Sequence, residues 1–467
     1  MLHVALINGP LPDGALFMRE GRCTQRSSIW ATQWPPISLA YLAAVVRDAG
    51  ARPFVFDCPP AGLTLSGLAA ALRALAVDWC LLAVSTPTAR DDLRLAGEIK
   101  RRLPAVKIGA FGVHPTVLDR EILDAAPAVD CIVRGEPEET VRELLAREPA
   151  EVAGVTWRDG AMARHNPDRP AIANLDRLPW PAWDALDTGL YRLPFSRRRF
   201  LCAGPSRGCA FGCSFCTAGA YYGRRVRFRS PVSLAAEIVR DRREFGVDDF
   251  FMWAETFTLN RAFVLELCRR LRHDAPGIRW TCNSRVDSAD EALFREMRAA
   301  GCWMVSFGIE STDENVLAAM GKKIAPIDIE NALEAARRAG LKTVGHFILG
   351  LPGDSPRTIA QTSADARRFD LDFAQFYAAA PFVGSPLYAT ASRSGMVSAE
   401  DFPAVGQHRA TLRLPGLPPA EVDRALRRAV WDFYGRPRQI VRVLRTVGWG
   451  VGRQIAHEIG KRLRFGV

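Results

Sequence analysis

The sequence lacks the features that mark membrane, secreted and repeat proteins. No apolar run reaches the roughly 18 residues that a transmembrane helix needs. Residues 1–9 carry no basic segment ahead of an apolar stretch, so they predict a strand and not a signal peptide. No internal repeat or low-complexity tract is visible. These absences, with an ordinary 48% of hydrophobic and 24% of charged residues, predict a globular cytoplasmic protein.

Acidic residues are fewer than basic ones, and the formal net charge is +11. Much of this excess lies in residues 435–467, which hold eight basic residues and a single acidic one. The rest of the chain is nearly balanced, which argues against a nucleic-acid-binding surface over the whole protein. Apolar positions in this tail repeat at helical spacing. The tail therefore fits either a helix packed on the preceding domain or an interfacial helix on anionic lipid at the inner face of the membrane.

The first third of the chain alternates short apolar runs with helical periods. A domain at 1–150 is therefore predicted to be an α/β fold, a doubly wound parallel sheet whose ligands bind at the carboxyl ends of its strands. Ser38 is expected to cap the helix at 39–48. The predicted strands are Val4–Ile7, Pro53–Phe56, Cys80–Val84, Lys107–Phe111 and Asp130–Val133.

A hairpin and a Pro- and Trp-rich connector are expected at 151–195, and a second β/α series follows at 196–388. The second series is shorter than the ~250 residues of a complete eight-fold barrel, so it predicts a partial barrel. Its strands are expected at Phe200–Ala203, Phe250–Ala254, Trp280–Ser284, Met304–Ile309, Thr343–Leu349 and Phe373–Ala379. Residues 389–467 are predicted to form a helical C-terminal region with the basic tail.

Cysteine is present at 11 positions, an odd number in a chain far too long for a disulfide-stapled scaffold. Cys202 and most of the others stand singly in apolar segments and are interpreted as small buried side chains. The clearest of these are Cys58, Cys80, Cys131, Cys268 and Cys302.

Three cysteines stand apart, because Cys209, Cys213 and Cys216 lie within eight residues directly after a predicted barrel strand. Gly208 and Gly212 give this loop the backbone freedom to surround one centre. A zinc site or three unrelated thiols are the alternatives, but zinc would want a fourth thiolate or imidazole nearby, and none follows Cys216 closely. Three thiolates on a four-iron cluster would leave one iron open to a cofactor or substrate.

This CxxxCxxC loop, with Phe215 before its last cysteine, resembles that of the radical S-adenosylmethionine (SAM) enzymes. The resemblance implies a [4Fe–4S] cluster that binds SAM and, when an electron donor of flavodoxin or ferredoxin type reduces it, cleaves SAM to a 5′-deoxyadenosyl radical. Strand-end motifs in the same order as the family's extend it over residues 200–385, although Ala254 stands where many relatives have an acidic residue or Gly. The SAM-binding residues implied are Phe215, Glu255, Ser284, Arg285, Gly308, Glu310, Ser311 and Leu349.

The first domain resembles, more loosely, the cobalamin-binding domain of cobalamin-dependent radical SAM enzymes. No Asp-x-His-x-x-Gly follows its first strand, so cobalamin is expected base-off and without a histidine ligand, and His114 is interpreted as structural or as a contact to the cofactor's tail. The alternative is a flavodoxin-like domain that has lost its ligand. The cobalamin-binding residues implied are Asn8, Pro10, Ser85, Thr86, Gly109, Gly112, Arg134, Gly135 and Glu136.

The combined resemblance implies a C-methyltransferase that acts on an unactivated carbon of a small molecule, for which a lipid or a tetrapyrrole is considered. The alternatives are an oxidative cyclase, hydroxylase or other non-methylating radical enzyme within the same family and, from another class, an RNA-modifying or nucleic-acid-binding protein. No catalytic side chain is assigned. The chemistry needs both cofactors in one dry cavity, so the strand ends of the two domains are expected to face each other.

Overall fold

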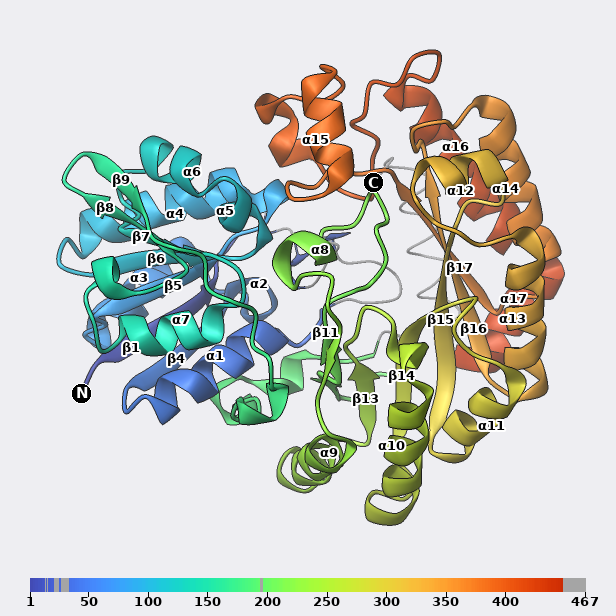
Figure 1. Ribbon diagram of the computed structural model, residues 1–467, viewed down its shortest axis with the longest axis horizontal. Helices are drawn as coiled ribbons and strands as arrows, with labels where there is room; N and C mark the ends of the chain where they lie inside the picture. The colour runs from blue at the N-terminus through green and yellow to red at the C-terminus, as the bar shows by residue number, and fades with distance from the viewer. Residues whose placement is uncertain (13, 15, 21–24, 27–32, 194–195, 448–467) are drawn as a thin grey trace.

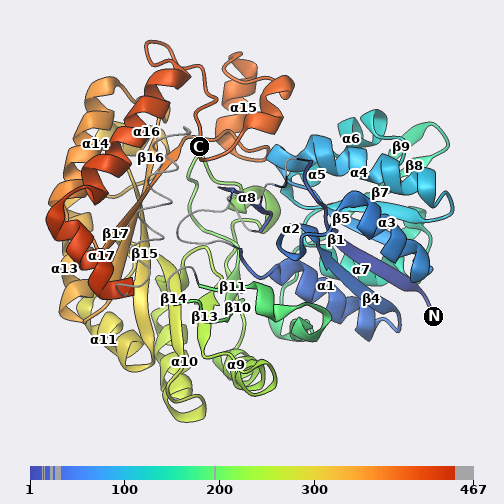
Figure 2. The same ribbon diagram turned by 180° about the vertical axis from the view of Figure 1, so that it is seen from behind.

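The computed structural model describes residues 1–447 except 13, 15, 21–24, 27–32 and 194–195. Two parallel sheets, each with its own helices, lie on either side of the short helix α8 (Ala218–Tyr221) (Figure 1). The view from behind shows the same arrangement (Figure 2). No described helix is long and apolar enough to cross a membrane.

The N-terminal sheet has seven strands in the order β4-β1-β5-β6-β7-β8-β9. The first five are parallel and the last two antiparallel, because the hairpin expected in the connector continues this sheet from β7. The parallel strands match the five apolar runs of the sequence closely. The bounds are β1 His3–Asn8, β4 Arg52–Asp57, β5 Trp79–Ala83, β6 Lys107–Phe111, β7 Cys131–Val133, β8 Val155–Asp159 and β9 Met162–His165.

Helices cover both faces of this sheet, as a doubly wound fold requires. The expected cap at Ser38 is wrong: helix α1 (Ile37–Asp48) begins two residues earlier than expected, so Ser38 lies in its first turn, and the Ser38 hydroxyl donates to Glu20 at 2.7 Å. Thr64, in contrast, accepts from Gly67 N and caps α3. The other helices are α2 Cys58–Ala61, α3 Leu65–Ala74, α4 Ala89–Arg102, α5 Val113–Val117, α6 Asp119–Ala125 and α7 Pro137–Leu144.

The second sheet has six parallel strands in sequence order, β10-β13-β14-β15-β16-β17, and forms the predicted partial barrel. Its strands are β10 Phe200–Ala203, β13 Asp249–Met252, β14 Arg279–Arg285, β15 Cys302–Glu310, β16 Lys342–Leu349 and β17 Phe373–Ala378. The helices outside it are α9 Pro231–Phe245, α10 Arg261–Asp274, α11 Glu291–Ala299, α12 Glu314–Ala319, α13 Pro326–Arg338 and α14 Pro356–Arg368. A small hairpin, β11 Ser206–Arg207 with β12 Arg227–Phe228, encloses the cysteine loop.

Buried charge joins the two halves of the molecule. Arg207, two residues before the first cysteine of the loop, donates to Glu138 at 3.0 Å and to Glu136 at 3.3 Å, and both acids are in the first domain. Arg227 also donates to Glu136. These four side chains are at most about one-tenth exposed, so the link is an internal one.

The C-terminal region begins with α15 (Pro386–Arg393) and α16 (Pro419–Tyr434) and reaches α17 (Pro437–Val447). Helix α17 packs on the barrel: Val443 is buried, Gln439 donates to the Asp372 carbonyl at 2.6 Å, and Arg442 pairs with Asp370. The first part of the basic tail thus follows the packing alternative. Residues 448–467, which carry its last four basic residues, lie outside the described part.

Candidate active site

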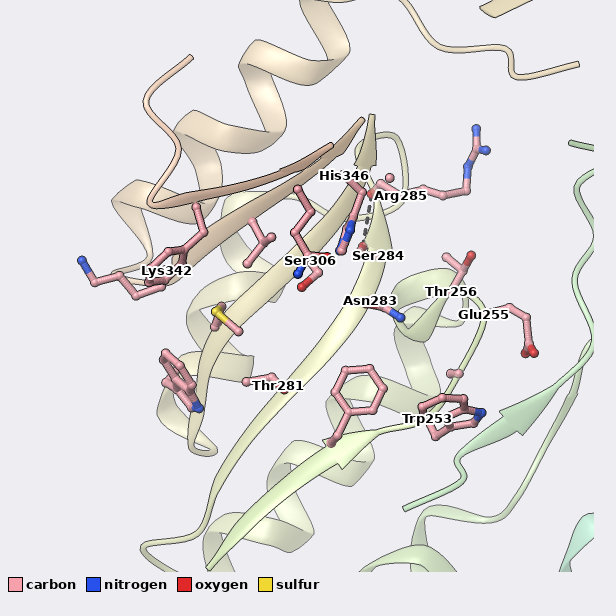
Figure 3. Close-up of a pocket in the computed structure, with 18 of the residues that line it drawn as sticks. Trp253, Glu255, Thr256, Thr281, Asn283, Ser284, Arg285, Ser306, Lys342 and His346 are labelled. Carbon is pink, nitrogen blue, oxygen red and sulfur yellow. Dashed lines mark hydrogen bonds between the residues drawn. The ribbon is translucent and has the colours of Figure 1, made fainter. Parts of the chain in front are cut away.

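A cavity of about 1050 Å³ occupies the partial barrel and opens toward the N-terminal domain. The cysteine loop and the carboxyl ends of the strands line one end, where Glu255 and Arg285 lie (Figure 3). Lys342, at the start of β16, lies at the other end (Figure 3). The cavity therefore runs along the strands, with the polar strand ends of the expected SAM site at one end of it.

All three cysteines of the loop, half-buried, line this cavity. The loop is held by its backbone: Gly208 has φ +92°, and a Cβ there would lie 2.3 Å from the Arg225 carbonyl oxygen. On the other side, Ser214 N donates to the Met320 carbonyl at 2.9 Å. Three thiols are thus directed to one space, and no described group of three or more His, Cys, Asp and Glu side chains forms a site for a single metal ion.

Glu310 reaches the cavity because β15 is irregular between Gly308 and Glu310 and Glu310 has a positive φ of +69°. Its carboxylate accepts from Lys322 Nζ at 3.0 Å, and the same ammonium donates to the Gly308 carbonyl at 2.7 Å. Lys322 is buried and lines the cavity, but the sequence interpretation missed it. Its place directly after a helical period gives no sign of a role.

Arg285 is positioned from two sides. It donates to both carboxylate oxygens of Asp287, at 2.8 and 2.7 Å, and its guanidinium lies 3.8 Å from the ring centroid of Phe211 in the cysteine loop. Its neighbour Ser284 lies in a buried hydroxyl group with Thr258, 2.5 Å away. The strand end therefore presents a fixed cation beside the loop.

The structure brings most, but not all, of the implied SAM-binding residues to this cavity. Phe215, Glu255, Ser284, Arg285, Gly308 and Glu310 line it. Ser311 and Leu349 do not: the Ser311 hydroxyl lies 3.3 Å from that of Thr362, and Leu349 packs in the core with α16. Side chains alternate between the faces of a strand, so Ile348 lines the cavity in place of Leu349.

Two features of the cavity wall were not singled out in the sequence. His346 on β16 stacks on Tyr377 of β17, with Nδ1 3.1 Å from the phenol oxygen, and Tyr377 donates to Gln375. Figure 3 shows His346, Ser306 and Asn283 along the same wall. The wall near β13 is aromatic, because Trp34 packs on Phe251 at 4.4 Å between ring centroids.

A second cavity, of about 50 Å³, lies at the strand ends of the N-terminal sheet. Ser85, Thr86 and Gly112 line it from one side, and Thr217 and Tyr221, which follow the last cysteine of the loop, line it from the other. The predicted facing of the two sets of strand ends is therefore confirmed. His114 also lines this cavity, and burial lowers its pKa to about 4.

Six of the implied cobalamin-binding residues line neither cavity: Asn8, Pro10, Gly109, Arg134, Gly135 and Glu136. Gly109 lies inside β6, where a Cβ would meet Leu81 at 2.8 Å, and not at a strand end. Arg134 donates to Asp168 at 2.9 Å, and Glu136 belongs to the interdomain ion pairs. A buried charge needs a partner of opposite charge, and Arg134 and Glu136 have theirs within the protein.

Glu20 borders both cavities. It is 6% exposed, and burial raises its pKa to about 7 despite two hydrogen bonds from Ser38. Close by, Arg19 pairs with Asp92 at 2.8 Å and adds a buried charge at the strand ends. The sequence interpretation assigned no role to Glu20 or Arg19.

The residues present fit the groups that the resemblance implies. Three convergent thiols suit an iron–sulfur cluster with one open iron. At the strand ends, Asn8 Oδ1 and Arg19 Nη1 are buried and have no hydrogen-bond partner within the described residues. Ligand pockets usually measure about 300–1,000 Å³, so the small cavity alone holds no large cofactor. Glu20 lines both cavities, which are therefore neighbours.

The comparisons with known proteins agree with this geometry. Residues 204–366 match the radical SAM superfamily and residues 30–145 match the B12 binding domain. An uncharacterised methyltransferase of Pyrococcus horikoshii is 29% identical over 88% of this chain and 90% of its own. An anaerobic magnesium-protoporphyrin IX monomethyl ester cyclase of Cereibacter sphaeroides is 29% identical over 77% of this chain and 60% of its own.

The fold is also that of a solved structure. The radical SAM methyltransferase TsrM from Kitasatospora setae, with cobalamin and a [4Fe–4S] cluster bound, superposes with a TM-score of 0.67 at 17% identity, covering 84% of this chain and 74% of TsrM. The radical SAM domain implies a [4Fe–4S] cluster and SAM as cofactors, and the B12-binding domain implies cobalamin. The chain is a radical SAM enzyme with an N-terminal B12-binding domain and belongs with the cobalamin-dependent radical SAM enzymes.

Proposed function

We propose that this enzyme transfers a methyl group to an unactivated carbon of a small molecule. The observation that carries the proposal is that Glu20 lines both cavities, so the cavity with the cysteine loop and the cavity at the cobalamin-side strand ends are neighbours. A radical is too reactive to travel, so its source, the substrate and the methyl donor must share a closed site. When bound, the cluster with SAM supplies the radical and cobalamin supplies the methyl group.

The chain's own residues would bind, orient and exclude water. Cys209, Cys213 and Cys216 hold the cluster in this proposal. Glu255 and Arg285 are placed for the ammonium and carboxylate of SAM, because charge-assisted hydrogen bonds are strong in a dry pocket. Lys322 orients Glu310 and the Gly308 carbonyl at the same end.

At the strand ends of the first domain, Ser85, Thr86 and Gly112 are placed to contact cobalamin. His114 is buried, and its ring lies 3.3 Å from the Thr86 hydroxyl. This contact supports a structural role for His114, one of the two roles expected for it. Cobalamin would bind base-off and without a histidine ligand.

The aromatic wall of the barrel supports a substrate with a sizeable apolar part. Trp34, Phe251 and Trp253 pack edge to face around one side of the cavity. The opposite wall offers the His346, Tyr377 and Gln375 side chains to polar groups of the substrate. Such a lining suits a lipid or a tetrapyrrole better than a small hydrophilic molecule.

Oxidative cyclisation is the second candidate, favoured by the 29% identity to the cyclase of Cereibacter sphaeroides. An RNA-modifying role is disfavoured, because Arg227 and Arg229, part of the basic run after the cysteine loop, are buried and ion-paired. The two radical reactions give products of different composition. Methylation adds a methyl group from SAM to the product, and cyclisation does not.

This difference gives the experiment. The enzyme is loaded anaerobically with cluster and cobalamin and incubated with small-molecule extracts and SAM that carries a trideuterated methyl group. Mass spectrometry should find a product heavier by one trideuterated methyl substitution, absent with Cys213→Ala. Products that contain no deuterium while 5′-deoxyadenosine accumulates would reject methyl transfer and favour the cyclase-like outcome.

A further inference from the structure

The outer side of the cysteine loop carries exposed cations. Ala210 and Gly212, which lie between the cysteines, are themselves exposed. The guanidinium of Arg224 lies against Gly212, since a Cβ at Gly212 would be 2.9 Å from Nη1 of Arg224. Gly321 also approaches this glycine, since a Cβ at Gly321 would be 3.1 Å from the Gly212 carbonyl oxygen.

Each of these neighbours adds exposed positive charge to the surface. Arg224 and Arg225 are exposed on one side, and Lys323 is exposed two residues after Gly321 on the other. Within the described residues, none of the three forms an ion pair with a carboxylate, unlike the neighbouring Arg227 and Lys322. About half of the exposed arginines in the described part have such a partner, so this patch is distinguished by its place beside the cysteine loop.

The other basic side chains nearby are engaged and do not extend this patch. Arg227 and Arg229 are buried in ion pairs with Glu136 and Glu237. Arg198 pairs with Asp249, the first residue of β13, at the edge of the sheet opposite to the cysteine loop. The basic residues at 197–199 and 224–229 therefore do not form one surface.

We propose that Arg224, Arg225 and Lys323 form the docking surface for an acidic, low-potential electron-donor protein of flavodoxin or ferredoxin type. The proposal rests on the proposed function only in needing a reducible cluster at the cysteine loop. One electron leaves the reduced flavin or iron–sulfur group of the donor and enters the cluster, so that the donor is oxidised and the cluster reduced by one electron each. Because the backbone of the cysteine loop is exposed, only a thin layer of protein would separate the donor's redox group from the cluster.

Charge complementarity supports this partner. Unpaired cations at a rim raise the association rate of an acidic partner and make binding sensitive to salt. The patch is small and compact, whereas nucleic-acid binding needs a longer stripe of basic residues along a backbone. An acidic protein that approaches briefly and leaves after one electron fits a small, charged and weakly apolar surface.

The test reverses the three charges together in Arg224→Glu, Arg225→Glu, Lys323→Glu. The cluster-loaded variant is titrated with oxidised flavodoxin by calorimetry at low and high salt. Its affinity should fall at least tenfold at low salt, and most of the salt dependence should disappear. The matched control reverses three exposed arginines elsewhere, Arg120→Glu, Arg424→Glu and Arg427→Glu, and should retain most of the affinity.

A chemical reductant separates docking from chemistry. Dithionite needs no docking surface, so the triple variant should keep its iron content and its dithionite-driven cleavage of SAM, while cleavage driven by flavodoxin falls at least tenfold. Unchanged flavodoxin affinity would overturn the proposal, as would an equal loss with dithionite, which would place these residues in the cofactor site. If the wild-type enzyme cleaves SAM but methylates nothing, the proposed function fails and the docking surface stands.

Discussion

The thiol of Cys213 illustrates how one residue depends on its surroundings. Burial raises its pKa, while the nearby charge of Lys322 acts in the opposite direction. We predict that Cys213→Ala loses most of its iron after anaerobic reconstitution and all 5′-deoxyadenosine formation, because no described thiol outside the loop lines the cavity. The matched control is Cys202→Ala, a fully buried thiol that lies on β10. Full iron content in Cys213→Ala would contradict the assignment of Cys213 as a ligand of the cluster.

Glu20 makes stability depend on pH. Burial raises its pKa from 4.5 to about 7, so the folded chain retains a proton that the unfolded chain releases. Stability should therefore fall as pH rises from about 4.5 to about 7 and then level off, by about 3 kcal/mol in all. Urea denaturation of the cofactor-free chain should show this slope, and Glu20→Gln should flatten it. An exposed control, Glu148→Gln, should keep the slope; an unchanged slope in Glu20→Gln would contradict the account.

Residues with a motif could be predicted from the sequence, and residues defined by packing could not. The cysteine loop and the strand ends with Glu255, Arg285 and Glu310 all line one cavity, because the carboxyl ends of parallel strands share one edge of the sheet. The irregularity of β15 that turns Glu310 into the cavity was not predicted. Glu20 and Lys322 were missed, since their roles arise from contacts with distant Ser38 and Gly308. Neither has a local pattern that marks it.

At the scale of elements, Arg207 links the hairpin before the cysteine loop to the first turn of α7. Its partners Glu136 and Glu138 are each only 3% exposed at the side chain. We predict that Arg207→Met lowers the free energy of unfolding by about 3–5 kcal/mol, because it leaves the buried Glu138 carboxylate without its cation, while Glu136 keeps Arg227. Arg142→Met breaks a pair with Asp48, which is 55% exposed, and should cost less than about 1 kcal/mol. If Arg207→Met and Arg142→Met shifted the denaturation midpoint equally, the ion pairs of Arg207 would contribute no more than an exposed pair, which would contradict the account.

Elements were predicted well where one rule governs them. The five parallel strands of the first sheet follow from short apolar runs, because both faces of such strands are buried. The hairpin β8–β9 was expected in the connector, yet it extends the first sheet. Its turn at Asp159-Gly160 can be predicted from the local sequence, whereas the sheet edge that a hairpin joins depends on tertiary packing. The interdomain role of Glu136 was hidden for the same reason.

At the scale of the whole molecule, the account depends on the junction of the two domains. The Val383 amide N–H lies 3.3 Å from the Thr86 hydroxyl, and Tyr191 donates to Asp57 at 2.8 Å, so segments on both sides of the barrel hold it against the first sheet. The strand ends then face each other across α8, as Figures 1 and 2 show. The central claim is that this junction brings cobalt and iron to one cavity.

The most direct measurement is anomalous scattering at the cobalt and iron edges from crystals of the anaerobically loaded enzyme. The account predicts iron peaks at the Cys209–Cys216 loop and a cobalt peak at the Ser85, Thr86 and Gly112 strand ends, with no protein layer between them. A matched data set from Cys213→Ala crystals should lose the iron peaks and keep the cobalt peak. A cobalt peak at the opposite edge of the first sheet, or one separated from the iron by packed side chains, would contradict a shared active site.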